Sequence, residues 1–328
     1  MADAELVRVM RGGIVDCVHR GYIAVVDTAG YLLYSAGNAD TVVYLRSCTK
    51  PFQALAVIRS GAAEKYGFTT EELALMAGSH SGTPDHTRIV TGILAKIGVD
   101  AGELQCGVGR PLDAKAYEAL LLSGGKPSVL QHNCSGKHSG MLAACRAMGW
   151  DVATYREWDH PLQVMLREIV GEFAGMPAAE IHLALDGCGV PTFGIPMKNL
   201  ALMFANLGTA ARDDNIDLSV IARAMQQYPI VFSGENRIDS ALVIASKGNL
   251  IAKGGAEGAI GVSVVDKGVG IALKMTDGSN RGHIPALIAL MLAQGHISAD
   301  EAAELERLQP SAISIHTGQR AGEMLPVL

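Results

Sequence analysis

The fold is decided by residues 250–275, which read LIAKGGAEGAIGVSVVDKGVGIALKM. This stretch contains three short β-prone runs separated by turns of glycine, lysine and aspartate. The three runs are 250–253, 259–265 and 270–275. They predict an antiparallel meander, and the apolar run 241–245 before them is predicted as a further strand. The run 285–293 after them has helical composition and an almost wholly apolar surface, which suits a helix packed on a sheet.

The N-terminal end is also predicted to be β, whereas the middle of the chain is predicted to be helical. Residues 22–26 and 31–34 are strand-like and flank Asp27-Thr-Ala-Gly30, which has hairpin turn chemistry. Helical periodicity recurs in the middle of the chain, at 51–60, 70–77, 86–97, 115–122, 136–148, 161–173 and 218–228. The predicted fold class is therefore α/β (α+β), with one antiparallel sheet from N- and C-terminal strands, flanking helices and an inserted helical lobe.

The domain organisation follows from length and from the lack of internal boundaries. At 328 residues the chain exceeds a typical single domain, yet it contains no repeat, low-complexity tract or Pro/Ser linker. We expect one compact two-lobed unit over 1–328. Its sheet lobe would take in about 1–60 and 235–328, and its helical lobe about 61–234.

Composition excludes several classes of function. The formal net charge of -6 and the lack of a basic cluster argue against a nucleic-acid partner. The N-terminus lacks the basic and apolar regions of a signal peptide, and no stretch approaches about 20 apolar residues. We therefore expect a cytoplasmic protein without a membrane segment. Its six cysteines are spread along the chain, which favours thiols over a disulfide framework.

The first chemical motif is Ser47-Cys-Thr-Lys50, in which serine and lysine are three residues apart. One helical turn brings such a pair together, as in a Ser-Lys acyl-transfer dyad. The lysine must be neutral to accept the proton of serine, so burial or another cation has to lower its pKa. Pro51 fits only in a first helical turn, where we expect Ser47 as well, although proline disfavours the α conformation at Lys50. A second match, Ser123-Gly-Gly-Lys126, contains two glycines that indicate a turn.

Two further polar segments follow the motif along the chain. Gly78-Ser79-His80-Ser81-Gly82 ends a predicted helix, so it is either a capped terminus or a loop in which Ser79 or Ser81 acts as a proton relay or second nucleophile. Lys253-Gly-Gly255 ends a predicted strand, where small residues let a substrate approach backbone N–H donors. The order of these three segments is similar to that in serine β-lactamases and penicillin-binding proteins.

A pair of thiols suggests a metal site. Cys134 lies in His132-Asn-Cys-Ser-Gly-Lys-His138, and Cys188 lies in Asp186-Gly-Cys-Gly-Val-Pro191. Two cysteines flanked by His and Asp at glycine-containing turns could converge on a tetrahedral zinc ion. The segment lacks a Cys-x-x-Cys pair, so two buried structural thiols are the alternative interpretation.

Together these segments closely resemble the class 3, rhizobial-type L-asparaginases of the asparaginase II family. The resemblance extends from Arg11-Gly-Gly-Ile-Val15 to Ile271-Ala-Leu-Lys-Met-Thr-Asp-Gly278. Its most specific stretches are Arg46-Ser-x-x-Lys-Pro51, Ala77-x-Ser-His-Ser81, Asn133-Cys-Ser-Gly-Lys-His138 and Asp186-Gly-Cys188. The resemblance implies a fold related to serine β-lactamases and glutaminases, and a homodimer.

The resemblance also implies roles for individual residues. Its catalytic set is two tandem Ser-Lys pairs, Ser47 with Lys50 and Ser79 with Lys253. Its zinc ligands are Cys134, Lys137 and Cys188, and Asp186 lies just beyond these ligands. Asp186, Arg46 and His80 are among the expected substrate-binding residues. His138, which residue chemistry alone would make a ligand, becomes a substrate contact or a neighbour of the ligands. From the polar stretch 233–240 we add Arg237 as an anchor for a substrate carboxylate.

These assignments predict hydrolysis of the L-asparagine side-chain amide to L-aspartate and ammonia through an acyl-enzyme. Ser47 would attack the amide carbon while Lys50 accepts its proton, with Zn2+ positioning the substrate. One alternative is another Ser-Lys amidohydrolase that acts on glutamine, β-lactams or peptides. A different class of answer is a zinc-dependent amino-acid-binding protein that senses asparagine without turning it over.

Overall fold

The computed structural model describes residues 2–308 and 310–328. They form two compact units, here called the sheet unit and the helical unit. The sheet unit comprises the chain up to Cys48, together with Ile195–Thr209 and Ala241–Leu328. The helical unit comprises Thr49–Gly194 and Ala210–Ser240.

The strands lie mostly near the two ends of the sequence. They are β1 Ala4–Arg11, β2 Ile14–Asp27, β3 Leu32–Ala36, β4 Val42–Tyr44, β5 His182–Leu185, β6 Pro191–Pro196, β7 Leu250–Gly255, β8 Ala259–Val264, β9 Val269–Met275, β10 Ala312–Ser314 and β11 Arg320–Pro326.

The helices lie mostly in the middle. The α-helices are α1 Lys50–Arg59, α2 Ala62–Lys65, α3 Thr70–Met76, α4 Pro84–Ile97, α5 Ala114–Leu122, α6 Ser135–Met148, α7 Pro161–Ala174, α8 Met197–Ala210, α9 Ser219–Gln227, α10 Pro229–Phe232, α11 Ile238–Ala245, α12 Asn280–Ala293 and α13 Ala299–Leu308. Short 3-10 helices are η1 Arg46–Thr49, η2 Ala101–Glu103, η3 Val129–Gln131 and η4 Ala178–Glu180.

The sheet unit is built around one antiparallel sheet with the strand order β10-β11-β1-β2-β9-β8-β7, in which β3 also pairs with β2. The C-terminal meander β7-β8-β9 forms as predicted, and β9 pairs with β2 from Gly21↔Met275 to Asp27↔Val269. N- and C-terminal strands therefore share one sheet. This confirms the predicted α/β class.

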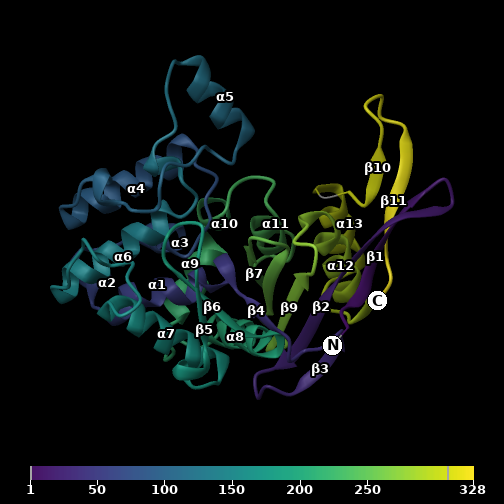
Figure 1. The fold of residues 1–328 in the computed structure, drawn as a ribbon, viewed down its shortest axis with the longest axis horizontal. Helices are drawn as coiled ribbons and strands as arrows, with labels where there is room; N and C mark the ends of the chain where they lie inside the picture. The colour runs from purple at the N-terminus through teal and green to yellow at the C-terminus, as the bar shows by residue number, and fades with distance from the viewer. Residues whose placement is uncertain (1, 309) are drawn as a thin grey trace. The chain divides into compact units, whose positions relative to one another are not determined.

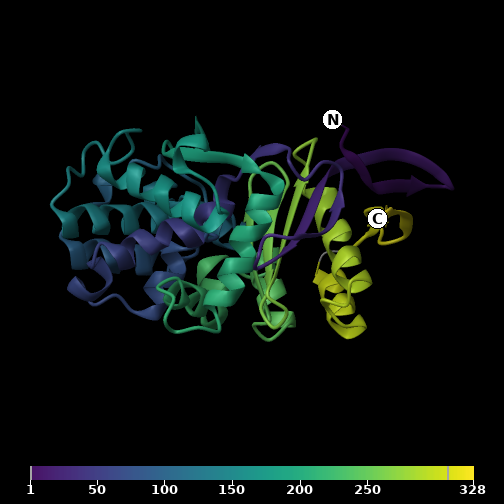
Figure 2. The same cartoon turned by 90° about the horizontal axis from the view of Figure 1, so that it is seen from below.

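Helices pack on both faces of this sheet (Figure 2), with α8 on one side and α12 on the other. Close approach of α8 depends on two glycines, because a Cβ atom at Gly270 would overlap the Ala201 carbonyl and one at Gly261 would overlap the Phe204 ring. Residues on β7 to β9 are almost all buried as a result. Burial on both faces explains why these strands are apolar runs without strict alternation.

One predicted strand was wrong. Residues 241–245 belong to α11, Ile238–Ala245, rather than to the sheet. Ser240, in the first turn of this helix, donates from its Oγ to the carbonyls of Gly234 and Arg237. A five-residue apolar run fits a strand and a buried helix equally well, so periodicity could not separate the two.

The helical unit packs around α1 and α3 (Figure 1), which both contact α6 and α9. The seven helices predicted from periodicity in the middle of the chain all form, with boundaries shifted by at most two residues. Eight of the ten residues of α1 are buried, including Lys50 at its first position. The helix is therefore enclosed from its start, and Lys50 is enclosed with it.

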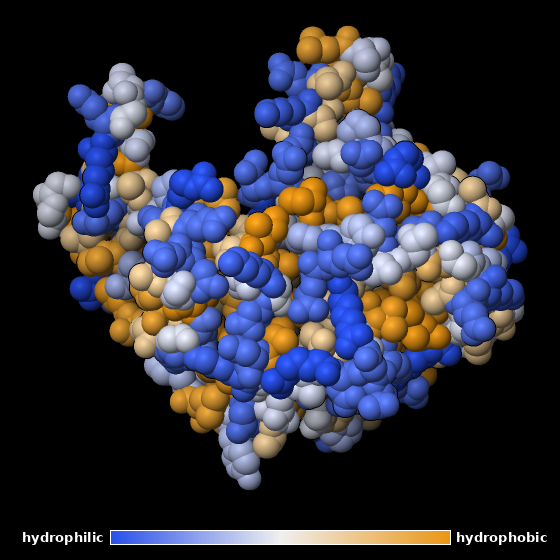
Figure 3. All heavy atoms as spheres, turned by 180° about the vertical axis from the view of Figure 1, so that it is seen from behind, coloured by the Kyte–Doolittle hydropathy of each residue, from blue (hydrophilic) through white to orange (hydrophobic). Residues whose placement is uncertain are grey.

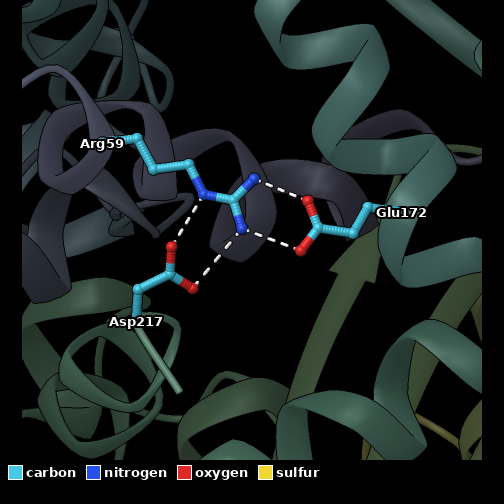
Figure 4. Close-up of polar contacts among 3 residues, drawn as sticks. All are labelled: Arg59, Glu172 and Asp217. Carbon is cyan, nitrogen blue, oxygen red and sulfur yellow. Dashed lines mark hydrogen bonds and ion pairs between the residues drawn. The ribbon is translucent and has the colours of Figure 1, made fainter. Parts of the chain in front are cut away.

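A half-exposed ion-pair network joins three parts of the helical unit (Figure 4). Arg59, at the end of α1, makes two hydrogen bonds to the Glu172 carboxylate on α7, of 2.6 and 2.8 Å, and two to Asp217, of 2.7 and 3.5 Å. Both carboxylates raise the pKa of the Arg59 guanidinium, with Glu172 the larger influence, against an opposing effect of burial.

No helix in the part of the chain that the structure describes is long and apolar enough to cross a membrane. Exposed hydrophobic side chains do occur. The face in Figure 3 shows them as separate patches among hydrophilic residues.

Candidate active site

Lys50 is the central polar residue of the helical unit. Its side chain is only 1% exposed, because α1 begins at Lys50 and is buried from its first turn. Its Nζ donates a hydrogen bond of 2.8 Å to Ser79 Oγ and one of 3.2 Å to the Asn133 carbonyl oxygen. The lysine thus connects the start of α1 with the loop after α3 and the loop before α6. The resemblance pairs Ser79 with Lys253, so this direct contact between Lys50 and Ser79 is new information.

The loop that carries Ser79 is held tightly in place. It follows α3, whose N-terminus is capped by Thr69, and it begins at Gly78, where a Cβ atom would overlap the Phe232 carbonyl of α10. Two positions further on, Ser81 Oγ donates a hydrogen bond of 2.8 Å to the Ser233 carbonyl oxygen. The Ser79 hydroxyl therefore sits on a fixed backbone rather than on a mobile helix end.

His80 is buried between this loop and α6. Its Nδ1 accepts a hydrogen bond of 3.1 Å from the Gly82 N–H, so its Nε2 carries the proton and donates to Ser135 Oγ at 2.8 Å. Burial, followed by the positive charges of His86 and Lys50, holds the pKa of His80 well below its usual value. His80 is therefore a neutral donor near neutral pH.

The two predicted thiols meet in a second cluster. Cys134 is the N-cap residue of α6, Lys137 lies in the first turn of that helix, and Cys188 lies in the turn between β5 and β6. All three side chains are buried, and Lys137 Nζ lies 3.0 Å from Cys188 Sγ. We call these three residues the thiol-amine cluster.

The charges of this cluster are coupled. A hydrogen bond from the Cys188 thiol holds the pKa of Cys134 well below its usual value despite burial, and the same bond raises the pKa of Cys188. Burial alone would lower the pKa of Lys137, but the nearby sulfurs of Cys188 and Cys134 raise it overall. The cluster thus favours a thiolate at Cys134 beside a charged amine.

The donor set of the thiol-amine cluster suits zinc, since zinc binds sulfur and nitrogen ligands. In the described chain no group of three or more His, Cys, Asp or Glu side chains is arranged to hold a metal, and Lys137 as a third ligand stays a prediction. Asp186 is adjacent, with Oδ2 3.9 Å from Cys188 Sγ. Cys134, Lys137 and Cys188 therefore fit a zinc ion, provided that Lys137 loses its proton on binding.

His138 follows Lys137 on α6 and is completely buried. Its Nδ1 lies 2.6 Å from the Tyr155 hydroxyl, whereas its buried Nε2 has no hydrogen-bond partner among the described residues. Burial, against an opposing effect of the Cys188 thiol, lowers the pKa of His138 to about 4. Sequence reasoning missed Tyr155, because nothing in its local sequence links it to a residue 17 positions earlier.

The remaining predicted site residues, apart from Arg237, lie in the sheet unit. Ser47 is half-buried in η1, directly before α1 rather than in its first turn, because α1 begins only at Lys50 with Pro51 in its first turn. Lys253 is buried on β7, and its Nζ donates a hydrogen bond of 2.7 Å to the Gly254 carbonyl. A Cβ at Gly255 would lie 2.8 Å from the Leu45 carbonyl, so glycine lets the end of β7 pack against the chain just before Ser47.

Two arginines complete the predicted set. Arg46 has a positive φ of 50°, which is uncommon for a residue other than glycine, and it lies in the turn beside Ser47. Arg237 is half-buried, and its backbone carbonyl accepts a hydrogen bond from Ser240. The roles of both arginines in substrate binding stay predictions.

With this geometry in place, comparison with protein families gives a clear result. A family model described as L-asparaginase II matches residues 7–326. The chain belongs to the L-asparaginase II family. Membership supports an amidohydrolase activity on a small-molecule substrate, in agreement with the resemblance seen in the sequence. A search of curated proteins gives no match.

Three solved structures with a similar fold are distant in sequence. Mglu in its native form is 15% identical with a TM-score of 0.45, and the match covers 84% of this chain but only 61% of the Mglu chain. A putative beta-lactamase from Bacteroides dorei is 15% identical (TM-score 0.43), with 78% and 84% of the two chains covered. A beta-lactamase from Mycobacterium bovis is 16% identical (TM-score 0.41), with 84% and 95% covered.

Proposed function

We propose that this protein hydrolyses the side-chain amide of L-asparagine to L-aspartate and ammonia through a serine acyl-enzyme. The observation that carries the proposal is the buried contact between Lys50 Nζ and Ser79 Oγ, in a chain of the L-asparaginase II family. Burial disfavours the charged form of a lysine, and only the neutral amine can accept a proton.

The reaction takes place in two halves. In the first, Ser47 Oγ forms a bond to the amide carbon while its proton passes to the neutral amine of Lys50. The carbon–nitrogen bond then breaks, and the nitrogen leaves as ammonia after it takes up that proton. In the second half a water molecule attacks the acyl carbon, which releases L-aspartate and returns a proton to Ser47 Oγ.

Ser79 acts on Lys50 in this scheme. Its hydroxyl oxygen accepts a hydrogen bond from Lys50 Nζ at 2.8 Å, which orients the amine and offers a path for a proton. Lys253 serves as the second base, and backbone N–H groups stabilise the oxyanion. Acylation of Ser79 instead of Ser47 is the variant mechanism, because each serine has a lysine partner in this proposal.

The proposal assigns Zn2+ to Cys134, Lys137 and Cys188. When bound there, the metal would supply positive charge that positions the amino-acid substrate. The chain's own contribution is to keep the ligands buried and to hold Lys137 Nζ next to Cys188 Sγ, 3.0 Å away. The resemblance further predicts a homodimer, which light scattering after gel filtration tests directly.

The test is ammonia release from L-asparagine and L-glutamine, together with turnover of a chromogenic β-lactam, by wild type, Ser47→Ala and Ser79→Ala. We expect asparagine-selective release that is lost in Ser47→Ala, and faster release from glutamine or β-lactam cleavage would identify the rival amidohydrolases. Ser123→Ala is the matched control, because Ser123 begins the exposed second Ser-x-x-Lys match. Asparagine binding without turnover by wild type would overturn the proposal in favour of an amino-acid sensor.

A further inference from the structure

Tyr155 carries a buried hydroxyl whose hydrogen bonds are fully accounted for. The side chain is completely buried in the helical unit, and its ring lies edge-on to the His138 imidazole with centroids 5.6 Å apart. The hydroxyl oxygen accepts the Gln105 backbone N–H at 3.0 Å and lies 2.6 Å from His138 Nδ1.

These two contacts fix the position of a proton. The Gln105 backbone N–H can only donate, so it cannot take the hydroxyl proton of Tyr155. Among the described residues the one acceptor within reach is His138 Nδ1. The hydroxyl therefore donates to Nδ1, Nδ1 keeps its lone pair for that bond, and the imidazole proton resides on Nε2.

This tautomer has a consequence for metal binding. A histidine that binds a metal uses the lone pair of one nitrogen and donates the N–H of the other to an acceptor. In His138 the lone pair of Nδ1 is taken by Tyr155, and Nε2 carries a hydrogen instead of a lone pair. Nε2 is also buried, next to Cys188 of the thiol-amine cluster.

We propose that Tyr155 is a positioning residue that holds His138 as an Nε2–H donor, thereby withholding it from the metal and leaving Lys137 as the nitrogen ligand of the thiol-amine cluster. The inference rests on the proposed zinc role of that cluster. It explains why a cluster with a histidine next to the lysine binds through an amine, which is an uncommon ligand, instead of an imidazole.

His160 provides an internal reference for this tautomer. Its Nδ1 accepts the Leu162 backbone N–H at 3.1 Å, and its Nε2 donates to the Asp151 carbonyl at 2.9 Å. His160 is therefore also an Nε2–H imidazole, but its partners are backbone groups that a Tyr155 variant leaves unchanged.

The experiment is two-bond 1H–15N correlation NMR on protein labelled with 15N-histidine, in the zinc-loaded wild type, in Tyr155→Phe and in Tyr117→Phe. Tyr117→Phe is the matched control, because Tyr117 lies on α5, which buries none of its residues. We expect His138 to show the Nε2–H pattern, as His160 does, in wild type and in Tyr117→Phe. In Tyr155→Phe, which loses only the hydroxyl, His138 should shift toward the Nδ1–H tautomer or become a metal ligand while His160 stays unchanged. An Nδ1–H pattern for His138 in wild type, or an unaltered His138 in folded Tyr155→Phe, would overturn the inference.

Metal content gives a second readout that does not depend on Tyr155→Phe folding. Zinc bound per chain should be the same in His138→Ala as in wild type and should fall at least tenfold in Lys137→Met. Loss of zinc from His138→Ala, or retention by Lys137→Met, would contradict the ligand assignment. Neither readout uses asparagine turnover. A wild type without asparaginase activity that gives both expected results would contradict the proposed function but not this inference.

Discussion

The chain contains the same four-residue pattern twice, and the two copies have opposite surroundings. Lys50 of the first copy is 1% exposed and donates to Ser79 and to the Asn133 carbonyl. Ser123 and Lys126 of the second copy are both exposed, and Ser123 Oγ donates only to the Leu120 carbonyl of its own helix. A Ser-x-x-Lys pattern therefore indicates chemistry only where the fold encloses the lysine among polar partners.

Local structure explains the difference. Lys50 opens a helix that is buried on nearly all sides, so its side chain points into a packed unit. In the second copy the helix α5 ends at Leu122 and buries none of its residues, and Gly124 turns the chain away with a φ of +74°. The glycines of the second copy thus mark the end of a helix rather than a site.

Ser79→Ala removes the side-chain acceptor of Lys50 in the enclosed copy of the motif, and we expect a large loss of activity. Removing the hydroxyl leaves the buried Lys50 Nζ without one of its acceptors and breaks the proposed proton path. We expect ammonia release to fall by about 10²–10⁴-fold and the free energy of unfolding by about 1–3 kcal/mol. Ser123→Ala should change neither quantity by a measurable amount, and an activity loss below tenfold in Ser79→Ala would break the comparison.

Gly78→Ala examines the rigidity of the loop that carries Ser79. Its Cβ would overlap the Phe232 carbonyl, and backbone cannot move away as a flexible side chain would. We expect a loss of about 3 kcal/mol in the free energy of unfolding, at the upper end for overpacking. A Cβ at Gly124 meets no neighbouring atom, so Gly124→Ala should lower the free energy of unfolding only through its positive φ, by about 1 kcal/mol. Equal losses in urea denaturation of the two variants would contradict the account.

Stability against pH probes the burial around Lys50 and the thiol-amine cluster. Burial is the first cause of the lowered pKa values of His80, His86, His132 and His138. A histidine with a lower pKa in the folded state takes up its proton more readily when unfolded. Stability is therefore full above the unfolded pKa of about 6.5 and declines as pH falls below it. The melting temperature should fall steadily from pH 7 to pH 5, and a rise over that range would show that these histidines are not buried in neutral form.

Arg59→Met tests the contrast with buried Lys50, because Arg59 is a half-exposed cation that is already paired with two carboxylates. Solvent screens such pairs, so we expect a loss of about 1 kcal/mol or less. The loss should shrink further in about 1 M salt, where the Debye length is about 3 Å. Denaturation at low and high salt measures both values, and a loss that is large and independent of salt would mean that the network is better shielded than its exposure indicates.

Much of the fold could be predicted because its signals are local. Glycine-bounded apolar runs predicted the meander, and 3.6-residue periodicity predicted the helices of the middle region. The helix α8 was missed because its sequence, MKNLALMFANLGTA, is apolar on most sides, although it lies within the predicted helical lobe. The run 241–245 was assigned to the wrong state because a five-residue apolar run is too short for periodicity to separate a strand from a buried helix.

The candidate site could be predicted only in part. Single motifs pointed to Lys50, Ser79 and Cys134, since each lies in a segment of unusual polar composition. Their mutual contacts could not be predicted, because Lys50 and Ser79 are 29 residues apart and meet through helix packing. Tyr155 had no signal at all. Its role depends on one hydroxyl that reaches a histidine on another element.

The most direct test of the central claim is ammonia release from L-asparagine by Lys50→Met and Lys126→Met, measured beside wild type with zinc content determined on the same samples. Methionine keeps the length and apolar stem of lysine but removes the amine. The account predicts a loss of about 10²–10⁴-fold in Lys50→Met with zinc retained, and wild-type activity in Lys126→Met. Activity within tenfold of wild type in folded, zinc-containing Lys50→Met would contradict the claim that the enclosed copy of the motif is the one that performs the chemistry.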